Sequence, residues 1–471
     1  MDSSQRMQNA CEEPVWDETT DVIIVGSGFA GLSAAYEAAK RSHNVIILEK
    51  MSYCGGNSRI AGGGYCCWDS KLKLREELDL GSDSWQSHYE DTLKAGGGYN
   101  SPELVEVLAK EAPEGLDFLV DAGIPFRKTL PRIGGHSAYR SYQIACSGSE
   151  TIEKLTAAVL ESGNVEIHKK AKVQKLIRAH GERVGGVSVE IDGFTQHIHA
   201  TCGVIIASGG YAQDLAIRTV YKPSLTSSYN CTNHRGATGE MITLARSIGA
   251  DVLHMEFLQL YPCADPANGS IDQAAFLCYS GTGYGIIYVT DKGFRFVNEL
   301  ESREHVSNAQ ILSGSSPTYT ILNDEIFSRL GIKPEEIEAL VRRRRALQAA
   351  TIDELATHAG FAQDIFSSTV IQHNEAIKKK LDPVFRKPMT EQMVPLTDGR
   401  FYAIPQWPSV HYSMGGLRID RHAHVIDIWG KPIPGLYAAG EVCGGVHGID
   451  RLGGNGIAEC IVFGRIAGCL Y

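Results

Sequence analysis

The amino-acid sequence predicts an α/β fold that is interrupted by an α+β segment. An apolar run of strand length, Asp21–Val25, leads into a glycine-rich turn, a helix-like segment and a second apolar run, Asn44–Leu48. The same order of strand, glycine-rich loop and helix closes the chain, between Gly435 and Ile457. From about Asp251 to His411 the residue pattern differs from that of the flanking segments and predicts long loops and short helices. We therefore expect a parallel α/β domain that stops and later resumes.

The first turn has the glycine spacing of a dinucleotide-binding loop. It reads Gly26-Ser-Gly28-Phe-Ala-Gly31, and the acid Glu49 ends the second strand 18 residues after the last glycine. In such a loop Gly26 makes the tight turn, Gly28 lets the backbone reach a pyrophosphate, and Gly31 lets helix and strand pack closely. Glu49 is placed to bind ribose hydroxyl groups. Strand, turn, helix and acid together predict a Rossmann-like domain.

Further glycine clusters discriminate between two dinucleotide cofactors. Gly55-Gly-Asn-Ser58 and Ala61-Gly-Gly-Gly64 follow soon after the second strand, where a nicotinamide-binding domain does not need them. A flavin enzyme does, because its ring lies against backbone and its pyrophosphate needs more donors. A later apolar run, Gly203–Gly210, also stops at a double glycine, as strands that face a cofactor do. The sequence therefore favours FAD over NAD.

The remaining elements follow from hydrophobic periodicity. Helices are expected at Ser101–Phe118, Ser149–Glu161, Pro334–Ala349, Ile352–Ala359 and Gln363–Lys380. Strands are expected at Asn164–His168, Ala171–Ile177, Val184–Ile191, Ile286–Val289 and Phe401–Ile404. These patterns place an FAD-binding domain at residues 20–255 and 411–471, and a capping domain at residues 256–410.

The closing glycine-rich loop contains one arginine. A strand ends at Gly440-Glu441, a helix opens near Asn455, and Arg451 lies between them. A helix start offers free N–H groups and the positive end of its dipole, and an arginine can hold a carboxylate with two parallel hydrogen bonds. The stretch predicts a site for an anionic ligand. The alternative is a structural corner with a surface arginine.

Composition disfavours several classes of protein. The 471 residues carry a net charge of −10, which disfavours a nucleic-acid partner. The runs Arg342–Arg345 and Lys378–Lys380 are interpreted as solvated helix faces. The residues up to Thr20 lack the apolar core of a signal peptide, and the run Val22–Tyr36 is too short to span a membrane. Twelve scattered cysteines without a CxxC pair predict reduced thiols in a cytoplasmic protein, without attached haem or metal.

Taken in order, the motifs resemble those of the fumarate reductase/succinate dehydrogenase flavoprotein family, from about Asp21 to the C-terminus. The soluble flavocytochrome-like branch is the most similar in style, although its haem-bearing and FMN-bearing domains have no counterpart here. The segments that carry the resemblance are Val25–Gly31, Gly55–Ser58, Ala61–Gly64, Ala207–Gly210, Arg295–Glu299, His411–Gly416 and the closing stretch 435–457.

The resemblance implies an FAD-binding domain and a mobile capping domain with the substrate between them. The cofactor-binding residues expected from the motifs are Gly26, Gly28, Ala30, Gly31, Glu49, Lys50, Gly56, Asn57, Ser58, Gly62, Gly63, Val173, Ser208, Gly209, Tyr412, Gly440, Glu441, Gly456 and Ile457. Covalent members of the family carry a flavin-linked histidine near the position of Ser58. This sequence has none there, so we expect FAD to be bound noncovalently.

The resemblance also implies a chemistry. Arg303 matches the family's proton donor, and His411 and Arg451 match residues that hold a substrate carboxylate, with backbone groups of Gly63 and Gly454 beside them. The implied reaction passes a hydride from reduced FAD to one alkene carbon while Arg303 protonates its neighbour. The alternatives are that Arg303 forms an interdomain salt bridge and that His411 is a buried structural histidine.

One motif departs from the family pattern. Fumarate and succinate enzymes have Gln-x-His-Pro at the entrance to the cap, whereas this chain has Gln259-Leu-Tyr261-Pro262. A tyrosine supplies no cation for a second carboxylate, but it suits an uncharged or aromatic tail near Phe276, and the similar urocanate reductases carry tyrosine here. The alternative is that Tyr261 only packs. The family's Thr–Glu pair is not recognisable in Ala275–Gly281, which puts the usual glutamate–arginine relay in doubt.

The sequence therefore predicts an FAD-dependent oxidoreductase that reduces an α,β-unsaturated carboxylate, with urocanate or another arylacrylate preferred to fumarate. Two other hypotheses stay open: a dehydrogenase of a saturated carboxylic acid, and a flavin electron-transfer subunit without its own substrate. A steroid dehydrogenase is disfavoured, because a neutral ketone has no use for an arginine–histidine pair. Since no second Rossmann motif is present for NADH, an external electron donor is expected, either a reduced flavin or a redox protein.

Overall fold

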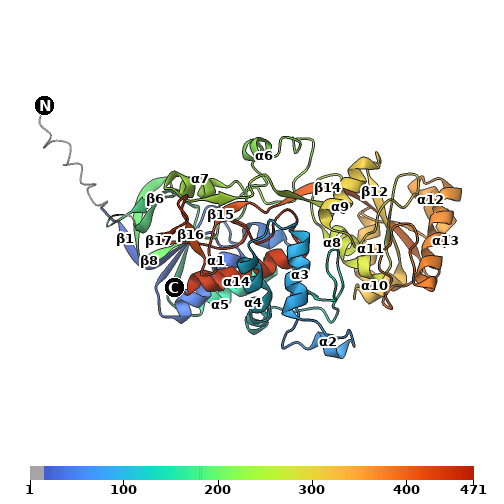
Figure 1. Ribbon diagram of the computed structural model, residues 1–471, viewed down its shortest axis with the longest axis horizontal. Helices are drawn as coiled ribbons and strands as arrows, with labels where there is room; N and C mark the ends of the chain where they lie inside the picture. Colours follow the sequence, from blue (N-terminus) through green and yellow to red (C-terminus); the bar gives the residue numbers. More distant parts are fainter. Residues whose placement is uncertain (1–14, 180, 182) are drawn as a thin grey trace, which may run out of the picture.

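The computed structural model describes residues 15–179, 181 and 183–471 (Figure 1). These residues form two hydrophobic cores. Most of the polar N-terminal stretch that was predicted not to be a signal peptide, residues 1–14, lies outside the described residues. The first core surrounds a large sheet. The second draws its buried residues from Tyr261 to Ile404, joined by Cys66 and Ile133 from the earlier part of the chain. Among the described residues, no helix is long and apolar enough to cross a membrane.

The first core contains an eight-stranded sheet in the order β16-β17-β8-β1-β2-β5, with β7 also paired to β8 and β6 to β7. Its strands are β1 (Glu18–Val25), β2 (Val45–Glu49), β5 (Val165–Lys169), β6 (Ala171–Arg178), β7 (Val184–Ile191), β8 (Phe194–Ile206), β16 (His424–Ile426) and β17 (Pro432–Ala438). β1 runs parallel to both neighbours, so that Ile24 pairs with Ile47 and Ile205. The carboxyl ends of these strands therefore meet at one edge, where ligands bind in open α/β sheets.

The helices outside the second core are grouped around this sheet, although only some of them contact its strands. They are α1 (Phe29–Lys40), α2 (Leu74–Glu77), α3 (Trp85–Ala95), α4 (Pro102–Asp121), α5 (Gly148–Leu160), α6 (Leu215–Tyr221), α7 (Glu240–Ser247) and α14 (Asn455–Gly468). α14 lies directly on α1, because Gly464 and Gly468 have no side chains: a Cβ at these positions would lie 2.5 Å from the Ala30 oxygen and 2.3 Å from the Ala34 oxygen. The last helix is thereby fixed over the start of the first.

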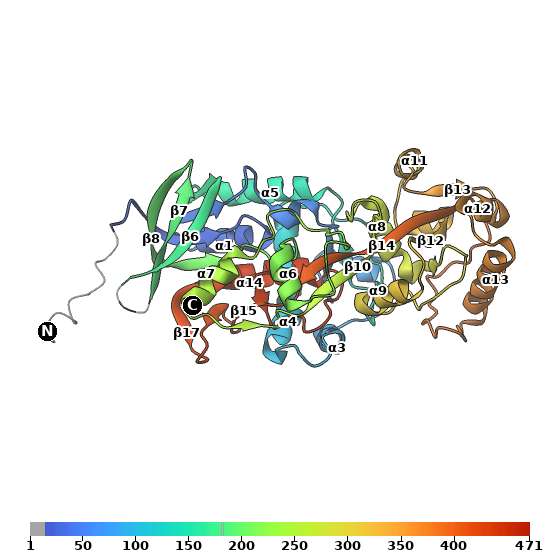
Figure 2. The ribbon, with the colours of Figure 1, turned by 90° about the horizontal axis from the view of Figure 1, so that it is seen from above.

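The second core contains a five-stranded sheet in the order β10-β14-β12-β11, with β13 on β14. Its strands are β10 (Leu258–Ala264), β11 (Ile287–Val289), β12 (Thr318–Asn323), β13 (Leu347–Ala349) and β14 (Phe401–Ser413), and its helices are α8 (Gln273–Ser280), η3 (Gly281–Tyr284), α9 (Arg303–Leu312), α10 (Asp324–Arg329), α11 (Pro334–Arg342), α12 (Ile352–Ala359) and α13 (Gln363–Lys379). β14 runs from this core back to the first, alongside β10 (Figure 2). The paired strands β10 and β14 thus join the two parts.

The remaining short elements lie between the larger ones along the chain. η2 (Gly56–Ile60) follows β2, β3 (Gly64–Cys66) pairs with β4 (Ser141–Gln143), and β9 (Val252–Leu253), β15 (Gly416–Arg418) and β18 (Cys443–Gly444) form a small sheet.

Most predicted elements agree with the structure within a few residues, and three differ. The helix predicted over Pro334–Ala349 ends at Arg342, because Arg344 adopts a left-handed φ of 57° and Leu347–Ala349 pairs with β14. The strand predicted over Phe401–Ile404 continues to Ser413. The strand predicted at Gly203–Gly210 begins earlier, at Phe194, and ends at Ile206.

The interpretation of the arginine run as a solvated helix face holds only for Arg342, because α11 ends there and Arg343–Arg345 follow it. Arg345 lies beyond the end of α11, is only partly exposed, and forms ion pairs of 2.6 Å with Asp272 and 3.3 Å with Asp265. The other three arginines and the lysines of the 378–380 run are exposed.

Candidate active site

A cleft of about 960 Å³ lies at the carboxyl ends of β1, β2 and β8. Its walls come from the first glycine loop, the ends of two strands, the second glycine loop and β6. They include Val25–Ala30, Leu48–Met51, Gly55–Ser58, Ala171–Val173, Ala207–Gly209 and Glu441. Three parallel strands therefore open into one cavity together with the start of α1.

The start of α1 is shaped for an anion. Gly26 has a left-handed φ of 108°, and a Cβ on Gly31 would lie 2.0 Å from the Gly26 oxygen, so that only glycine lets the helix approach the turn. The N-cap residue Gly28 has no side chain to cap α1, the Phe29 nitrogen donates to the Ser58 hydroxyl at 3.0 Å, and the first residues of the helix face the cleft. Free N–H groups at a helix start bind phosphate. Across the cleft, the Ser208 hydroxyl is buried without a partner in the described residues.

Glu49 is the last residue of β2 and contacts the first glycine loop through Ser27. Its carboxylate accepts hydrogen bonds from the Ser27 backbone nitrogen at 3.1 Å, from the Ser27 hydroxyl and from the Met51 nitrogen at 2.9 Å. The neighbouring Lys50 side chain points instead to Glu240 and Thr238, each at 2.8 Å. The acid is thus held in position at the edge of the cleft, which fits a ribose.

Glu441 lies where this cleft meets a second one. Its carboxylate accepts from the Ser413 nitrogen at 3.1 Å and from the Asn57 amide at 3.4 Å. Burial raises the pKa of Glu441 to about 7. Such a carboxyl group can accept or donate a hydrogen bond near neutral pH. The donor set, the glycine cradle and the unpartnered Ser208 hydroxyl fit FAD.

The second cleft has a volume of about 920 Å³ and shares Phe29, Asn57, Ser58, Glu441 and Cys460 with the first. The shared residues make the two clefts continuous. Its other walls come from both cores and include Gly62–Gly64, Gln143, Tyr261, Phe276, Tyr279, Ser280, Arg303, His411, Tyr412, Arg451, Gly454, Gly456 and Ile457.

Two arginines bring buried positive charge to this second cleft. Arg303 is 6 % exposed and Arg451 is 5 % exposed, and neither forms an ion pair with a carboxylate in the described part of the chain. Arg303 donates to the Gln259 side-chain oxygen at 3.0 Å, and Arg451 donates to the Leu452 carbonyl at 3.1 Å. The Nε atoms of both arginines are buried without a partner among the described residues.

Aromatic faces replace the missing carboxylates. The guanidinium carbon of Arg303 lies 4.5 Å from the ring centre of Tyr279 and 4.9 Å from that of Tyr261. The guanidinium carbon of Arg451 lies 4.2 Å from the ring centre of Tyr412. Burial, and then the charge of Arg303, lower the pKa of Arg451 below its ordinary value. An anion in the cleft would relieve this repulsion.

His411 lies between Arg451 and Thr232. Its Nε2 is 3.0 Å from Nη2 of Arg451, and its Nδ1 is 2.7 Å from the Thr232 hydroxyl. An arginine has only donors, so Nε2 of His411 is the acceptor and the proton resides on Nδ1. Desolvation, followed by the charges of Arg303 and Arg451, lowers the pKa of His411 well below its ordinary value. His411 is therefore neutral at pH 7.

Tyr261 presents its ring, not its hydroxyl group, to the cleft. The hydroxyl donates to the Ala275 carbonyl at 3.0 Å, and the ring centre lies 5.1 Å from that of His411. Apart from Arg303, His411 and Arg451, no basic side chain is found among the described residues that line the second cleft.

The structure brings nearly all of the predicted site residues to the two clefts. Gly31 and Gly440 line neither: each allows close packing beside the glycine loop, where a Cβ at Gly440 would lie 2.9 Å from that of Ala30. Sequence reasoning missed the loop before α7, which supplies Thr232, Asn233 and His234. The two glycines that follow, Gly236 and Gly239, were the available signal.

Sequence reasoning also missed the polar group behind Arg303. The Gln259 amide donates to one oxygen of Asp450 and, at 2.6 Å, to the carbonyl of Arg451. The other oxygen of Asp450 accepts from the Glu304 nitrogen at 3.2 Å. Asp450 therefore lies at the start of α9, one bridging amide away from Arg303.

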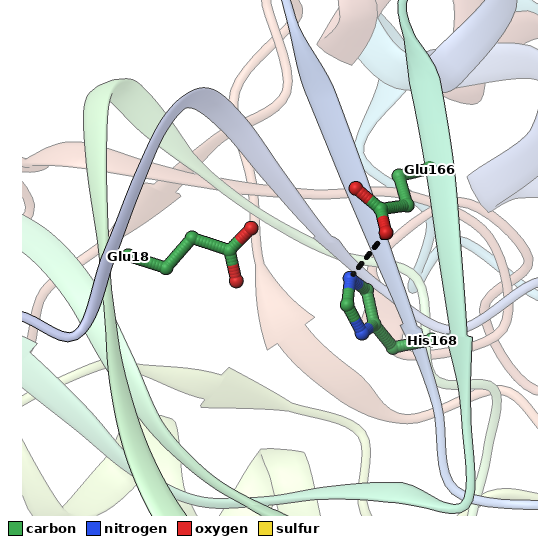
Figure 3. Close-up of side chains that lie close together, drawn as sticks. All are labelled: Glu18, Glu166 and His168. Atoms are coloured by element: carbon green, nitrogen blue, oxygen red, sulfur yellow. Dashed lines mark ion pairs between the residues drawn. The ribbon is translucent and has the colours of Figure 1, made fainter.

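A separate cluster contains Glu18, Glu166 and His168 (Figure 3). Nε2 of His168 lies 3.5 Å from Glu166, which is exposed, and none of the three residues lines either cleft. Exposed acidic groups of this kind form weak surface ion pairs. The cluster is not connected with the candidate active site.

Known proteins resemble this chain over nearly its whole length. The FAD binding domain family matches residues 21–457. An acrylate reductase flavoprotein subunit of Shewanella woodyi is 34 % identical over 463 residues, which cover 96 % of this chain and 91 % of that protein. A urocanate reductase of Eggerthella lenta is 31 % identical over 454 residues, covering 95 % and 74 %. The open conformation of a flavocytochrome c3 fumarate reductase matches with a TM-score of 0.73 and 30 % identity, covering 97 % of this chain and 78 % of that one.

Proposed function

The chain belongs to the FAD binding domain family, and from this premise we propose that it is a reductase of an α,β-unsaturated monocarboxylate. The observation that carries the proposal is the pair of buried guanidinium groups, Arg303 and Arg451, that have no carboxylate partner in the described residues. Buried charges in proteins are normally paired, because desolvating a lone charge costs several kcal/mol. A substrate carboxylate is the missing partner. Relatives named acrylate reductase and urocanate reductase support this reading.

FAD is the redox group of this enzyme, and we propose that it binds in the first cleft. The start of α1 would hold the pyrophosphate, Glu49 the ribose and the backbone near Val173 the adenine. Ser58 and Glu441, which line both clefts, would lie beside the flavin ring. We propose noncovalent binding, since no histidine stands next to Ser58 in the sequence. We also propose residues 256–410 as the capping domain.

The residues of the second cleft have distinct roles in this proposal. When bound and reduced, FAD supplies a hydride to the alkene. Arg451 holds the substrate carboxylate with its planar fork, and His411 and the ring of Tyr412 fix the orientation of that fork. A carboxylate held on a buried cation withdraws electrons from the alkene and stabilises the negative charge that develops in the reaction. Gly63 and Gly454 leave room for the substrate against backbone.

Arg303 donates the proton to the second alkene carbon in this proposal. Its guanidinium group lies over the rings of Tyr261 and Tyr279. Because Nη1 donates to the Gln259 oxygen, another nitrogen of the group can face the substrate. An arginine is a weak acid, with a pKa above about 12 in water. Burial alone would lower the pKa of Arg303, but its interactions with Tyr279, Tyr261 and Asp450 outweigh burial and leave the pKa raised. The proton can therefore leave only toward the negative charge that develops on the substrate. The step ends with a neutral guanidine that must be protonated again from solvent.

The tail of the substrate is proposed to be uncharged. A second carboxylate, as in fumarate, would lie against the ring of Tyr261 and the apolar side chains of Ile133, Ile271 and Phe276. The described lining residues offer it no further basic side chain. An arylacrylate or urocanate would instead pack on these groups. We therefore rank arylacrylates above fumarate.

The experiment that tests the function is an anaerobic assay on the purified flavoprotein with reduced viologen as electron donor. Oxidation of the dye by an acrylate, and not by a saturated acid or buffer, is the expected result. An external electron donor, a reduced flavin or a redox protein, would replace the dye in the cell. Failure of every unsaturated acid with the flavin present would contradict the proposal and favour a dehydrogenase of saturated acids or an electron-transfer subunit.

A further inference from the structure

Besides the Nε atoms of the two arginines, two further buried polar atoms in the second cleft have no partner in the described residues. They are Oε1 of Gln143 and the hydroxyl oxygen of Ser280, on side chains that are 3 % and 1 % exposed. Both residues line the cleft that also contains Arg303 and Arg451. A buried polar group without a hydrogen bond costs about 1–3 kcal/mol, so such groups in a cavity indicate a ligand.

The local structure fixes which atom of Gln143 faces the ligand. Its Nε2 donates to the Ser141 carbonyl at 3.1 Å and to the Ser141 hydroxyl at 2.6 Å, within strand β4. Both donors of the amide are therefore used, and Oε1 is left as an acceptor. Gln143 pairs with Gly64 of β3, at the end of the glycine run that lines the cleft.

Ser280 comes from a different element, the helix α8. It lies four residues after Phe276 on α8, so that both side chains are on the same face of the helix. Phe276 packs against the glycine run, since a Cβ at Gly62 would lie 2.9 Å from its ring. This contact places the Phe276–Ser280 face of α8 against the run that ends at Gly64, beside Gln143. The two free polar atoms thus belong to two walls of one cavity.

From this placement we propose that Gln143 and Ser280 form a recognition site for a hydrogen-bond donor on the substrate tail. The inference rests on the proposed function, because Arg451 is taken to hold the carboxylate. An N–H or O–H group, as in an imidazole or a phenol, can donate to Oε1 of Gln143, and Ser280 can donate to or accept from the same group. A second carboxylate has only acceptors and would face the Gln143 oxygen. A plain phenyl ring would leave both polar atoms unpaired.

The experiment compares acids that differ only in the tail. Binding of cinnamate, 4-hydroxycinnamate, urocanate and fumarate to the oxidised holoenzyme is measured from the perturbation of the flavin spectrum, and kcat/KM is measured with reduced viologen. Sites that hydrogen-bond a substrate hydroxyl or N–H strongly reject analogues that lack it. We expect 4-hydroxycinnamate or urocanate to bind at least tenfold more tightly than cinnamate. Ratios below tenfold for both acids would overturn the inference.

The variants separate recognition from folding. Gln143→Met keeps the volume and removes the acceptor, so it should lower the binding ratio toward one while cinnamate binds as before. Ser280→Ala should act in the same direction, and Ser33→Ala, which removes a buried, unpartnered hydroxyl of α1 that lines neither cleft, is its matched control. Equal losses for all four acids in Gln143→Met and Ser280→Ala would contradict the site. Since binding is measured without turnover, an absence of dye oxidation counts against the proposed function alone.

Discussion

Nη2 of Arg451 lies 3.0 Å from Nε2 of His411. Because the arginine can only donate, the histidine is held as a neutral acceptor, and its other nitrogen bonds the Thr232 hydroxyl at 2.7 Å. His411 thus orients the cation that is proposed to bind the carboxylate and does not itself supply a charge. A histidine at this position can therefore support Arg451 over the whole physiological pH range.

His411→Leu removes the acceptor behind Arg451 and is expected to raise KM for the unsaturated acid by about tenfold or more, because hydrogen bonds to charged groups contribute about 1.5–3 kcal/mol. FAD content should stay unchanged. The pKa of His411 lies below its ordinary value, so KM of the wild type should show no His411-linked rise between pH 6.5 and 8. A tenfold rise in KM per pH unit above 6.5 would show that a charged histidine binds the acid. His422→Leu, at an exposed histidine, is the control.

Arg303→Ala is expected to lower kcat by a factor of roughly 10² to 10⁴, the range typical of a lost general acid. The flavin spectrum should remain, because Arg303 lies in the second cleft and not in the first. The affinity for the unsaturated acid, measured from the perturbation of the flavin spectrum, should change far less than kcat. Near-normal turnover would refute the assignment of Arg303 as proton donor, and Arg343→Ala, at an exposed arginine, controls for a general loss of charge.

Gln259 links Arg303 to Asp450, which predicts an effect of Asp450 on turnover without contact to the substrate. The carboxylate of Asp450 holds the Gln259 amide so that its oxygen faces Arg303. Asp450→Asn can place an N–H group opposite Nε2 of Gln259 and favours the flipped amide, which would turn donors toward a cation. We expect kcat to fall by about tenfold or more with little change in KM. A change in KM alone would assign Asp450 to substrate binding instead.

The sequence predicted the Rossmann-like domain because its signals are local: the spacing from Gly26 to Gly31 and the acid Glu49 lie within one β-turn-α-β unit. The site around Arg303 could be placed only through a family resemblance, since Gln259, Arg303 and Asp450 come from distant segments. Their contacts depend on how β10 and α9 meet the last loop. The hydrophobic periodicity of a single segment does not indicate which distant segment it contacts.

The same reasoning explains the errors in the second core. The helix predicted over Pro334–Ala349 kept a plausible periodicity, yet its last residues pair with Phe401–Ala403 as β13. Tertiary pairing overrides propensity in such short segments. The acid that is linked to Arg303 also comes from a distant segment: Asp450, and not a residue of Ala275–Gly281, accepts from Gln259, which in turn accepts from Arg303.

Glu49→Ala is expected to lower the FAD content of the purified protein. The carboxylate accepts hydrogen bonds from Ser27 and Met51 and thereby braces the glycine loop as well as facing the proposed ribose. Loss of both contributions should be measurable as a higher Kd for FAD when apoprotein is titrated. An FAD affinity equal to that of the wild type would refute the ribose role. Glu190→Ala, on the solvent-exposed part of β7, is the control.

His373 predicts how stability depends on pH in the second core. It is 1 % exposed, and its Nε2 lies 2.7 Å from the Gly285 carbonyl, to which it donates. Burial, and then the charges of Lys387 and Arg295, lower the pKa of His373 to about 3. The unfolded chain binds this proton near pH 6.5 and the folded chain does not, so the stability is present above pH 6.5 and is lost as the pH falls toward 3.

Protonation of His373 in the unfolded chain should lower the free energy of unfolding by about 2 kcal/mol at pH 5, from the linkage between protonation and unfolding. His373→Gln retains a donor for the Gly285 carbonyl but does not titrate, so the thermal midpoint of the second core should fall less between pH 7 and pH 5 than in the wild type. Calorimetry at the two pH values measures this difference. His358→Gln, at an exposed histidine of α12, should keep the wild-type pH dependence. The same pH dependence in His373→Gln and wild type would mean that His373 takes up its proton in the folded state.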